Sequence, residues 1–213
     1  MSRLVALFLK LLKGGDPSRV SRFHTLRGEL ITARDILSIP WELFLRTLRI
    51  HRQGPWLSKQ AIQELSILLM EFGNARILEL GGGRSSIYFS RKCHSLHTIE
   101  ENFLWAQKIE SELRDSICQF RIENTELESR LRTKNSANMD YDLVLIDGGT
   151  DEFRKKAIQS LPLLNKNAIY VLDNSDRPIF KKIDFRIKPK KVVRLHGLVR
   201  HPFQATETTF FWF

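Results

Sequence analysis

Three consecutive glycines carry the strongest chemical signal in the sequence. They occupy positions 81–83, directly after the short apolar run 76–80, and they precede Arg84 and two serines. Glycines between a strand and a helix let the backbone turn sharply and let a ligand lie against it. The free amide groups at the start of the following helix can bind polar ligand atoms. The sequence therefore predicts a ligand-binding turn at this position.

Two acidic residues accompany the turn and indicate which ligand it binds. Glu79 lies two residues before the first glycine, and Glu100, at the end of the run 95–99, lies 21 residues after Glu79. A carboxylate at Glu79 attracts the cationic amino group of S-adenosylmethionine and repels the pyrophosphate of a dinucleotide. Glu100, which we prefer over Glu101, can accept hydrogen bonds from both ribose hydroxyls of either cofactor. Ser86 replaces the third glycine of the dinucleotide fingerprint, which also favours S-adenosylmethionine.

A second group of polar residues follows two later apolar runs. Asp147 follows the run 142–146, and Asp173 with Asn174 follows the run 168–172. Because the carboxyl ends of parallel strands lie at one edge of a sheet, we expect these three side chains to converge there. Their hard oxygen atoms suit Mg²⁺. The alternative is that Asp173 and Asn174 only cap the loop after their strand.

Apolar runs alternate with segments of helical spacing through residues 56–213. The expected strands are 76–80, 95–99, 120–122, 142–146, 168–172, 191–195 and 208–213. The expected helices are 58–72, a short helix around 87–89, 105–113 and 153–161. This alternation predicts a doubly wound, seven-stranded α/β sheet that is mostly parallel and has helices on both faces. The last two strands have no convincing helix between them, so we expect an antiparallel last strand.

Residues 1–55 differ from the rest and are expected to form a basic helical extension. The pattern of 18–37 predicts mixed helix, and Pro40 fits the first turn of a second helix. The stretch 53–55, Gln-Gly-Pro, breaks that helix. The chain therefore divides into this extension and a globular domain, 56–213.

The first residues of the extension form an apolar segment with basic neighbours. Residues 4–12 are almost entirely apolar, with Lys10 inside the segment and Lys13 after it. Because about 20 residues are needed to cross a bilayer, this segment is too short to span a membrane. Either it packs on the body of the protein as a short helix, or residues 4–13 rest on a membrane surface.

Positive charge is concentrated in two parts of the chain, whose formal net charge is +10. Residues 1–52 hold ten Lys and Arg against four Asp and Glu, and residues 181–200 hold eight against Asp184 alone. Such clusters favour an anionic partner: nucleic acid, anionic lipid, or a phosphorylated or carboxylated substrate. The alternative is a solvated surface that keeps the protein soluble.

The composition predicts a globular protein from a reducing compartment. A hydrophobic fraction of 42% is enough for a core. Cys93 and Cys118 lie 25 residues apart without the spacing of metal ligands, so we expect free thiols. Free thiols are typical of reducing compartments, and we therefore expect a cytoplasmic protein.

These motifs together resemble those of the class I, S-adenosylmethionine-dependent methyltransferases. The resemblance covers residues 56–213 and rests on the glycine turn, the carboxylates at the strand ends and the order of the elements. The strings 77–86, 171–177 and 207–211 resemble a bacterial subgroup of this family. The resemblance implies a Rossmann-like sheet. The residues that we expect to contact the cofactor are Glu79, Gly81, Gly83, Ser85, Glu100 and Asp147.

A finer resemblance concerns the catechol-type O-methyltransferases. That group holds a divalent metal with an Asp at the fourth strand and an Asp-Asn pair after the fifth. Asp147, Asp173 and Asn174 match these positions, which implies a Mg²⁺ ion that lowers the pKa of an acceptor hydroxyl. The group also has a lysine base three residues after the first Asp, where this chain has Thr150. The residues that could replace this base are Lys155, Lys156, His196 and His201.

We expect the chain to transfer a methyl group from S-adenosylmethionine to an oxygen atom of a small-molecule, glycan or lipid acceptor. The basic surface favours an anionic acceptor, and Asp147 is expected to touch the reacting centre. Positioning should supply most of the catalysis. Two alternatives stay open. One is a non-catalytic Rossmann-like module that docks on nucleic acid or a membrane, and the other is an NAD-dependent oxidoreductase.

Overall fold

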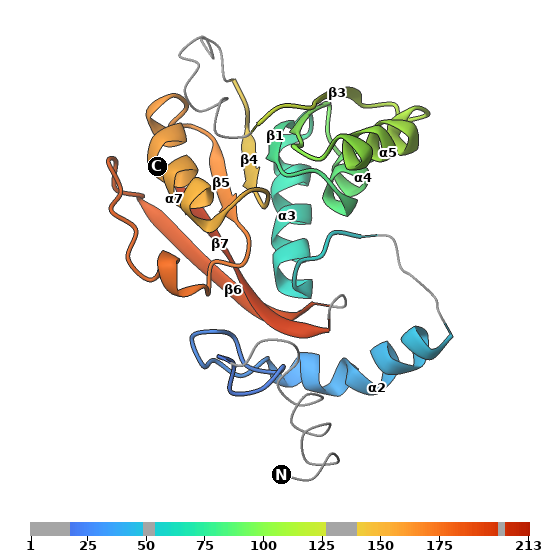
Figure 1. The fold of residues 1–213 in the computed structure, drawn as a ribbon, viewed down its shortest axis with the longest axis vertical. Helices are drawn as coiled ribbons and strands as arrows, with labels where there is room; N and C mark the ends of the chain where they lie inside the picture. Colours follow the sequence, from blue (N-terminus) through green and yellow to red (C-terminus); the bar gives the residue numbers. More distant parts are fainter. Residues whose placement is uncertain (1–17, 49–53, 127–139, 200–202) are drawn as a thin grey trace.

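The centre of the molecule is a seven-stranded sheet, as the sequence predicted (Figure 1). A computed structural model describes residues 18–48, 54–126, 140–199 and 203–213. The strands are β1 (Arg76–Leu80), β2 (Ser95–Ile99), β3 (Gln119–Glu123), β4 (Leu143–Ile146), β5 (Ile169–Leu172), β6 (Lys191–Val199) and β7 (Gln204–Trp212). They lie in the order β3-β2-β1-β4-β5-β7-β6. β1 to β5 are parallel, and β7 runs antiparallel to its neighbours β5 and β6.

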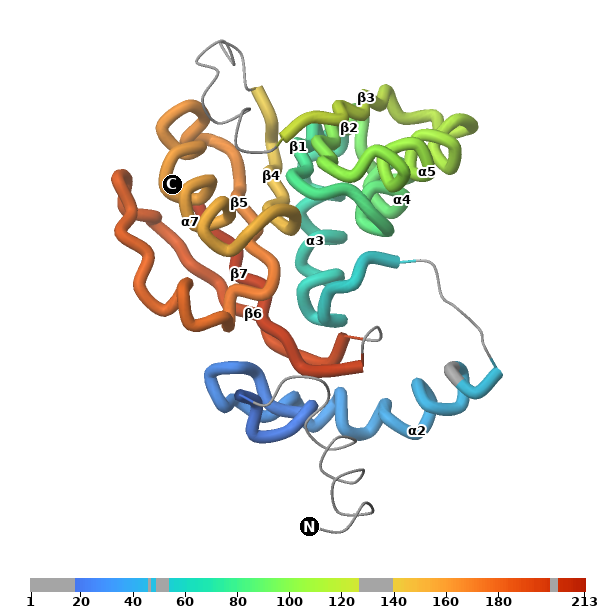
Figure 2. The backbone as a smooth tube through the Cα atoms, viewed as in Figure 1, coloured from blue at the N-terminus to red at the C-terminus, as the bar shows by residue number. Residues whose placement is uncertain are grey.

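Helices cover both faces of this sheet. They are α3 (Lys59–Phe72), α4 (Arg84–Ser90), α5 (Phe103–Leu113) and α7 (Asp151–Ser160), with the short 3-10 helices η1 (Leu161–Leu163) and η2 (Pro178–Phe180). A further helix, α2 (Ala33–Thr47), lies outside these two layers. Side chains of α3, α4 and α5 pack on one face, whereas those of α7 pack on the other. Figure 2 follows the chain through this alternation of strands and helices.

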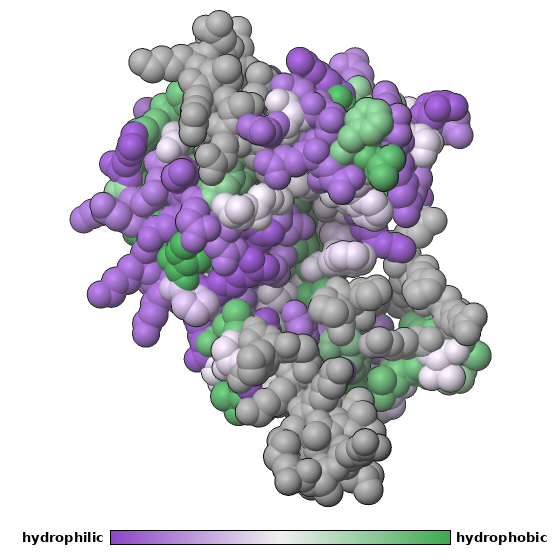
Figure 3. Space-filling view, viewed as in Figure 1, coloured by the Kyte–Doolittle hydropathy of each residue, from purple (hydrophilic) through white to green (hydrophobic). Residues whose placement is uncertain are grey.

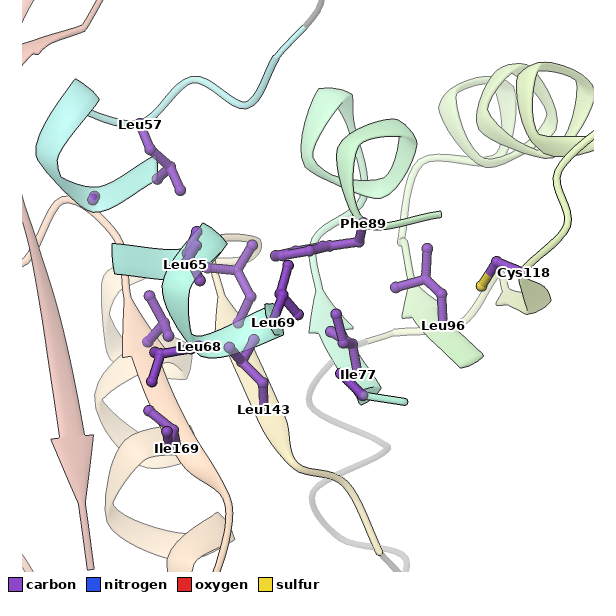
Figure 4. Close-up of a cluster of buried hydrophobic side chains, with 14 of the residues drawn as sticks. Leu57, Leu65, Leu68, Leu69, Ile77, Phe89, Leu96, Cys118, Leu143 and Ile169 are labelled. Atoms are coloured by element: carbon purple, nitrogen blue, oxygen red, sulfur yellow. The ribbon is translucent and has the colours of Figure 1, made fainter. Parts of the chain in front are cut away.

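The central strands β4 and β5 are buried along their whole length. Leu143 and Leu145 of β4 point toward α3, and Val144 and Ile146 point toward α7. Figure 4 shows Leu69 of α3 beside Leu143. Strands that are apolar on both sides need cover on both faces, which explains why these two runs were the clearest in the sequence.

The two strands at the C-terminal end extend beyond the runs that the sequence predicted. β6 continues to Val199, and β7 begins at Gln204 rather than in the predicted run 208–213. Thr206 and Thr208 are buried in β7 although both are polar. A buried hydroxyl that finds a hydrogen-bond partner does not show in a hydropathy pattern, so the prediction missed part of this strand.

The structure corrects the prediction for the extension. Residues 18–32 form turns rather than mixed helix, and α2 is a single helix with Pro40 inside it rather than in its first turn. Thr32 sets the start of α2, because its Oγ1 accepts a hydrogen bond of 3.2 Å from the Asp35 amide. Pro40 removes only one backbone hydrogen bond from the helix. The helix continues past it because buried residues on both sides, Asp35 and Leu45, hold it in place.

The described part of the extension packs against the hairpin formed by β6 and β7. Ile31 joins a small apolar cluster with Leu198, Phe203 and Ala205 of the hairpin. Arg19 Nη1 donates a hydrogen bond of 2.7 Å to the Ala205 carbonyl. In Figure 1, α2 lies at the end of this hairpin, away from the helices that cover the sheet.

Some predictions fall on parts of the chain that the structure does not describe. The predicted membrane segment, 4–13, and the candidate base His201 both lie outside the described residues. The boundary between residues 1–55 and 56–213 stays a prediction.

Cys93 and Cys118 are free thiols, as the sequence predicted. Their Sγ atoms lie 3.3 Å apart, at the side of the core that α5 covers. Burial raises the pKa of both thiols. Both are therefore protonated and unreactive at neutral pH.

The second basic cluster, described here from residue 181 to residue 199, lies on the surface of the molecule. Its Lys and Arg residues up to Arg194 are exposed. Between them, Ile183, Phe185 and Ile187 pack on the core at the α7 side. Exposed basic residues thus alternate with apolar residues that pack on the core. This pattern agrees with a solvated surface, which the sequence analysis kept as the alternative to an anionic partner.

Candidate functional site

The turns after β1 and β4 touch each other through two glycines. Gly81 has a φ of +93°, and a Cβ on it would lie 2.2 Å from the Gly148 Cα. The amides of Asp147 and Gly148 both donate to the Leu80 carbonyl, at 2.9 and 2.6 Å. Only glycine fits at either position, and the contact joins the two predicted groups of site residues. The sequence indicated Gly81, but it gave Gly148 no role.

Glu79 lies fully buried beneath the glycine turn. Its Oε2 accepts hydrogen bonds from the Ser86 hydroxyl at 2.5 Å and the Thr98 hydroxyl at 2.7 Å. Its Oε1 has no hydrogen-bond partner among the described residues. Burial raises the pKa of Glu79 to about 7, opposed by the hydroxyls of Ser85, Ser86 and Thr98. The carboxyl group is thus partly charged at neutral pH.

The position of Glu79 follows from the alternation of side chains along β1. Glu79 points to the same face as Ile77, toward α4, and therefore not along the edge of the sheet. We expected this carboxylate to face a ligand amino group directly. The structure instead places it behind the turn, where it supplies negative charge and a spare acceptor oxygen, so a direct contact stays a prediction.

Ser86 and Trp105 hold the glycine turn in shape. The Gly83 amide donates to Ser86 Oγ at 2.9 Å, and Trp105 Nε1 donates to the Gly82 carbonyl at 2.8 Å. A Cβ on Gly83 would meet nothing closer than Trp105 Nε1, at 3.7 Å. That is an ordinary van der Waals distance, so the role of Gly83 in making room for a ligand stays a prediction. Ser85 is buried in the first turn of α4, and its contact with a cofactor stays a prediction.

Glu100 connects the end of β2 to the glycine turn. Its Oε2 accepts a hydrogen bond of 2.8 Å from the Gly82 amide, and its Oε1 accepts one of 2.8 Å from the Asn102 amide. Each carboxylate oxygen can accept a second hydrogen bond. Glu101 is exposed, so the structure agrees with the preference for Glu100. The partly buried carboxylate of Glu100 lies where two ribose hydroxyls could donate to it.

Asp147 and Asp173 form a pair of carboxyl groups at the ends of β4 and β5. A hydrogen bond links them, Asp173 is buried, and the side chain of Asp147 is 34% exposed. Burial, together with the charge of Asp147, raises the pKa of Asp173 to about 8, although the hydrogen bond from the Thr208 hydroxyl lowers it. Burial also raises the pKa of Asp147, whereas the positive charges of Arg154 and Arg177 lower it. Burial thus makes the pair retain a proton more readily than two solvated carboxyl groups would, and Asp147 is the more exposed of the two.

Arg154 of α7 lies against this pair, and sequence reasoning missed it. Its Nη2 lies 3.6 Å from Asp147 Oδ1, and the guanidinium donates to the carbonyls of Asp147, Gly148 and Asp173. The side chain is only 8% exposed. A signal did exist: Arg154 shares an inward stripe with Ala157 and Ile158 of α7. A charged residue on such a stripe needs a buried partner.

The predicted Mg²⁺ site does not fit this geometry. Both oxygens of Asp173 accept hydrogen bonds, from the Thr208 hydroxyl at 2.8 Å and the Asn174 amide at 2.7 Å. Asn174 Oδ1 accepts a hydrogen bond of 2.8 Å from Arg177. Among the described residues there is no group of three His, Cys, Asp or Glu that could hold a metal. The fold brings Asp147, Asp173 and Asn174 together, but the positive charge beside them comes from arginine.

The candidate bases other than Asp147 have different contacts. Thr150, which stands where the lysine base of the catechol-type group would be, caps α7, because its Oγ1 accepts a hydrogen bond of 3.1 Å from the Phe153 amide. His196 bonds the Leu30 carbonyl at 3.1 Å and lies 3.9 Å from Glu29, so it holds the extension on β6. Lys156 is exposed on α7, and Lys155 is half-buried there. Of these residues, Asp147 alone lies at the carboxyl ends of the described strands, and its role in catalysis stays a prediction.

The residues around the turn fit S-adenosylmethionine better than a dinucleotide. Glu79, Glu100 and Asp147 place three carboxyl groups at or under the turn, and one buried oxygen of Glu79 lacks a hydrogen-bond partner. This donor set suits a nucleoside with a cationic side chain. The same charges would repel a pyrophosphate.

Comparison with known proteins identifies the fold. No family model matches the chain, and no curated protein sequence matches it. A proposed O-methyltransferase from Klebsiella pneumoniae superimposes with a TM-score of 0.58 over 99% of this chain and 96% of its own, at 17% identity. TomG, an O-methyltransferase of tomaymycin synthesis from Streptomyces achromogenes in complex with S-adenosylmethionine, gives 0.59 over 86% and 92%, at 19% identity. An O-methyltransferase from Bacillus cereus in complex with S-adenosylhomocysteine gives 0.52 over 84% and 97%, at 17% identity.

The chain has the fold of the S-adenosylmethionine-dependent O-methyltransferases. This methyltransferase fold differs from the dinucleotide-binding fold, whose strand order is 3-2-1-4-5-6. Here β7 lies between β5 and β6 and runs antiparallel to both. The predicted Rossmann-like sheet with an antiparallel last strand is therefore confirmed.

Proposed function

We propose that the protein transfers a methyl group from S-adenosylmethionine to a hydroxyl oxygen. The observation that carries this proposal is the acidic setting of the glycine turn, with Glu79 beneath it and Glu100 bonded to the Gly82 amide. This setting suits a cationic cofactor with a ribose. The methyltransferase fold supports the same conclusion.

In this proposal Asp147 accepts the proton of the acceptor hydroxyl. Asp173 keeps its own proton and donates it in the hydrogen bond with Asp147, which fixes the direction of the Asp147 carboxylate. Arg154 holds the backbone of this turn, and its charge lowers the pKa of Asp147 against the effect of burial. When bound, S-adenosylmethionine supplies an electrophilic methyl group on a sulfonium. Most of the rate enhancement then comes from holding the acceptor oxygen in line.

The acceptor in this proposal is a small molecule, a glycan or a lipid, and it carries negative charge. Arg177, whose side chain is about one-third exposed, lies close enough to Asp147 to lower its pKa. Arg177 and the net charge of +10 both favour an anionic acceptor. The fold does not determine the methyl acceptor, so we infer the class of the acceptor from the charge of the protein.

A comparison of melting temperatures tests the cofactor. We expect S-adenosylhomocysteine to raise the melting temperature of the full chain, because a ligand that binds only the folded state stabilises it. NAD at the same concentration should have no effect. A rise with NAD alone would support the oxidoreductase, and no rise with either ligand would support the non-catalytic module.

A further inference from the structure

Helix α2 has an unusual distribution of side chains, because its acidic residues are buried and most of its large apolar residues are exposed. Asp35 and Glu42 lie on the buried face, together with Leu45. Asp35 accepts hydrogen bonds from Thr32 at 2.9 Å and from a glutamine of α3 at 3.1 Å. Amphipathic surface helices normally bury the apolar face instead.

The opposite face of α2 forms an apolar stripe, which we define as Leu37, Trp41, Phe44 and Leu48. Their spacing of four, three and four residues places them on one side of a helix. Leu37 is 82% exposed, and the other three are between 51% and 52% exposed. The rings of Trp41 and Phe44 stack with centroids 5.5 Å apart. Figure 3 shows green, apolar surface in the part of the view where α2 lies.

The charge around the apolar stripe is positive. Arg34 on α2 is exposed, and the sequence from 46 to 52 contains three further arginines, Arg46, Arg49 and Arg52. The two acids of α2 are already used on its buried face, where Glu42 pairs with Lys59 at 3.0 Å. Among the described side chains of α2 the exposed charge is therefore positive, and the sequence at the C-terminal end of the helix is basic.

The positive charge distinguishes between two partners that could cover the apolar stripe, a second copy of the chain and a membrane surface. A second copy of the chain would bring its own positive charge against this face, and like charges repel. Anionic lipid headgroups are complementary to the arginines, while the acyl region accepts the leucines and the two aromatic rings. The described residues hold no helix that is long and apolar enough to cross a bilayer, so α2 would lie in the plane of the interface.

We propose that the apolar stripe of α2 binds the surface of a membrane that contains anionic lipids. The segment 4–12 adds support at the level of sequence, because it is also apolar and lies between Arg3 and Lys13. This proposal does not rest on methyl transfer, since membrane binding needs no cofactor. A failure of one proposal can therefore be distinguished from a failure of the other.

Flotation of the full chain with lipid vesicles tests this proposal. We expect binding to phosphatidylcholine vesicles that contain phosphatidylglycerol and little binding to phosphatidylcholine alone. The double variant Trp41→Gln with Phe44→Gln should bind at least about tenfold more weakly. The control is Leu104→Gln with Ile117→Gln, which changes two side chains that are 74% and 97% exposed elsewhere, and it should bind like the wild type.

Circular dichroism and size-exclusion chromatography complete the test. The Trp41 and Phe44 double variant should keep the wild-type melting temperature, because both side chains are exposed. Equal vesicle binding by that variant and the wild type would overturn the proposal, and so would no binding by the wild type. A wild-type dimer that the variant converts to a monomer, without vesicle binding, would assign the stripe to a second copy. A lower melting temperature in the variant, again without vesicle binding, would assign it to another segment of the chain.

Discussion

Gly81 and Gly148 pack backbone against backbone, and this contact joins the two halves of the site. A Cβ on Gly148 would lie 2.4 Å from the Gly81 Cα, and one on Gly81 would lie 2.2 Å from the Gly148 Cα. The glycine turn that we assign to the cofactor is thus fixed against the turn that carries Asp147. This arrangement brings a carboxylate close to the cofactor turn.

Substitution Gly148→Ala should destabilise the protein by at least about 3 kcal/mol, because backbone atoms cannot move aside for the methyl group. Thermal and urea denaturation followed by circular dichroism measure this loss. Gly54→Ala is the matched control, since a Cβ there meets nothing within 4 Å. A Gly148→Ala variant as stable as the control would show that the two turns are not packed as described.

Glu79→Gln should flatten the dependence of stability on pH. Burial raises the pKa of Glu79 from 4.5 to about 7, so the folded state binds more protons than the unfolded state between these values. Ionisation of the buried Glu79 therefore destabilises the folded state. This loss of stability is absent below pH 4.5 and grows as the pH rises. Above pH 7 it is complete and amounts to about 3 kcal/mol.

Melting temperatures of Glu79→Gln and the wild type, measured from pH 4.5 to pH 8, check this prediction. The two curves should converge at the acidic end, and the variant should be the more stable protein at the basic end. Glu101→Gln, at an exposed position, should follow the wild type. Parallel curves for Glu79→Gln and the wild type would mean that Glu79 is not buried as a titrating group.

Magnesium should have no effect on cofactor binding. Arg154 already supplies positive charge beside Asp147, and the oxygens of Asp173 and Asn174 have hydrogen-bond partners. Titration of Mg²⁺ into the protein with S-adenosylhomocysteine present should therefore release no binding heat. Equal affinity for S-adenosylhomocysteine in Mg²⁺ and in a chelator is the second expected result. Micromolar Mg²⁺ binding that Asp173→Asn abolishes would restore the metal site.

Substitution Asp147→Asn should lower methyl transfer at saturating cofactor by at least about a hundredfold, because an amide cannot accept the acceptor proton. The measurement is transfer of labelled methyl groups to a panel of anionic hydroxyl compounds. Asp142→Asn is the control, since Asp142 lies at the other end of the same strand, where it accepts from the Arg76 amide at 2.8 Å. Transfer by Asp147→Asn at the wild-type rate would exclude Asp147 as the base.

The sequence predicted most of the sheet because its central strands leave little choice. Apart from Asp142, runs such as 142–146 and 168–172 are hydrophobic, a pattern typical of strands that are covered on both faces. The ends of these runs located Asp147, Asp173 and Glu100 at one edge of the sheet. Local patterns were sufficient for these features.

The predictions that failed depended on contacts between distant residues. The burial of Thr206 and Thr208 in β7 depends on partners elsewhere in the chain, such as Asp173, which accepts from Thr208. One failure has a local cause instead, because the start of α2 depends on the Thr32 hydroxyl, which accepts from the Asp35 amide and does not show in the pattern of apolar residues. The place of Arg154 beside Asp147 requires knowing how α7 packs on the sheet.

The central claim is that Glu100 and the glycine turn bind S-adenosylmethionine, and calorimetric titration of S-adenosylhomocysteine tests it most directly. The wild type should bind with a micromolar dissociation constant, Glu100→Ala should bind at least about tenfold more weakly, and Glu101→Ala should bind like the wild type. No binding heat at millimolar ligand from a folded protein would contradict the account. Equal affinity of Glu100→Ala and the wild type would contradict the role of Glu100.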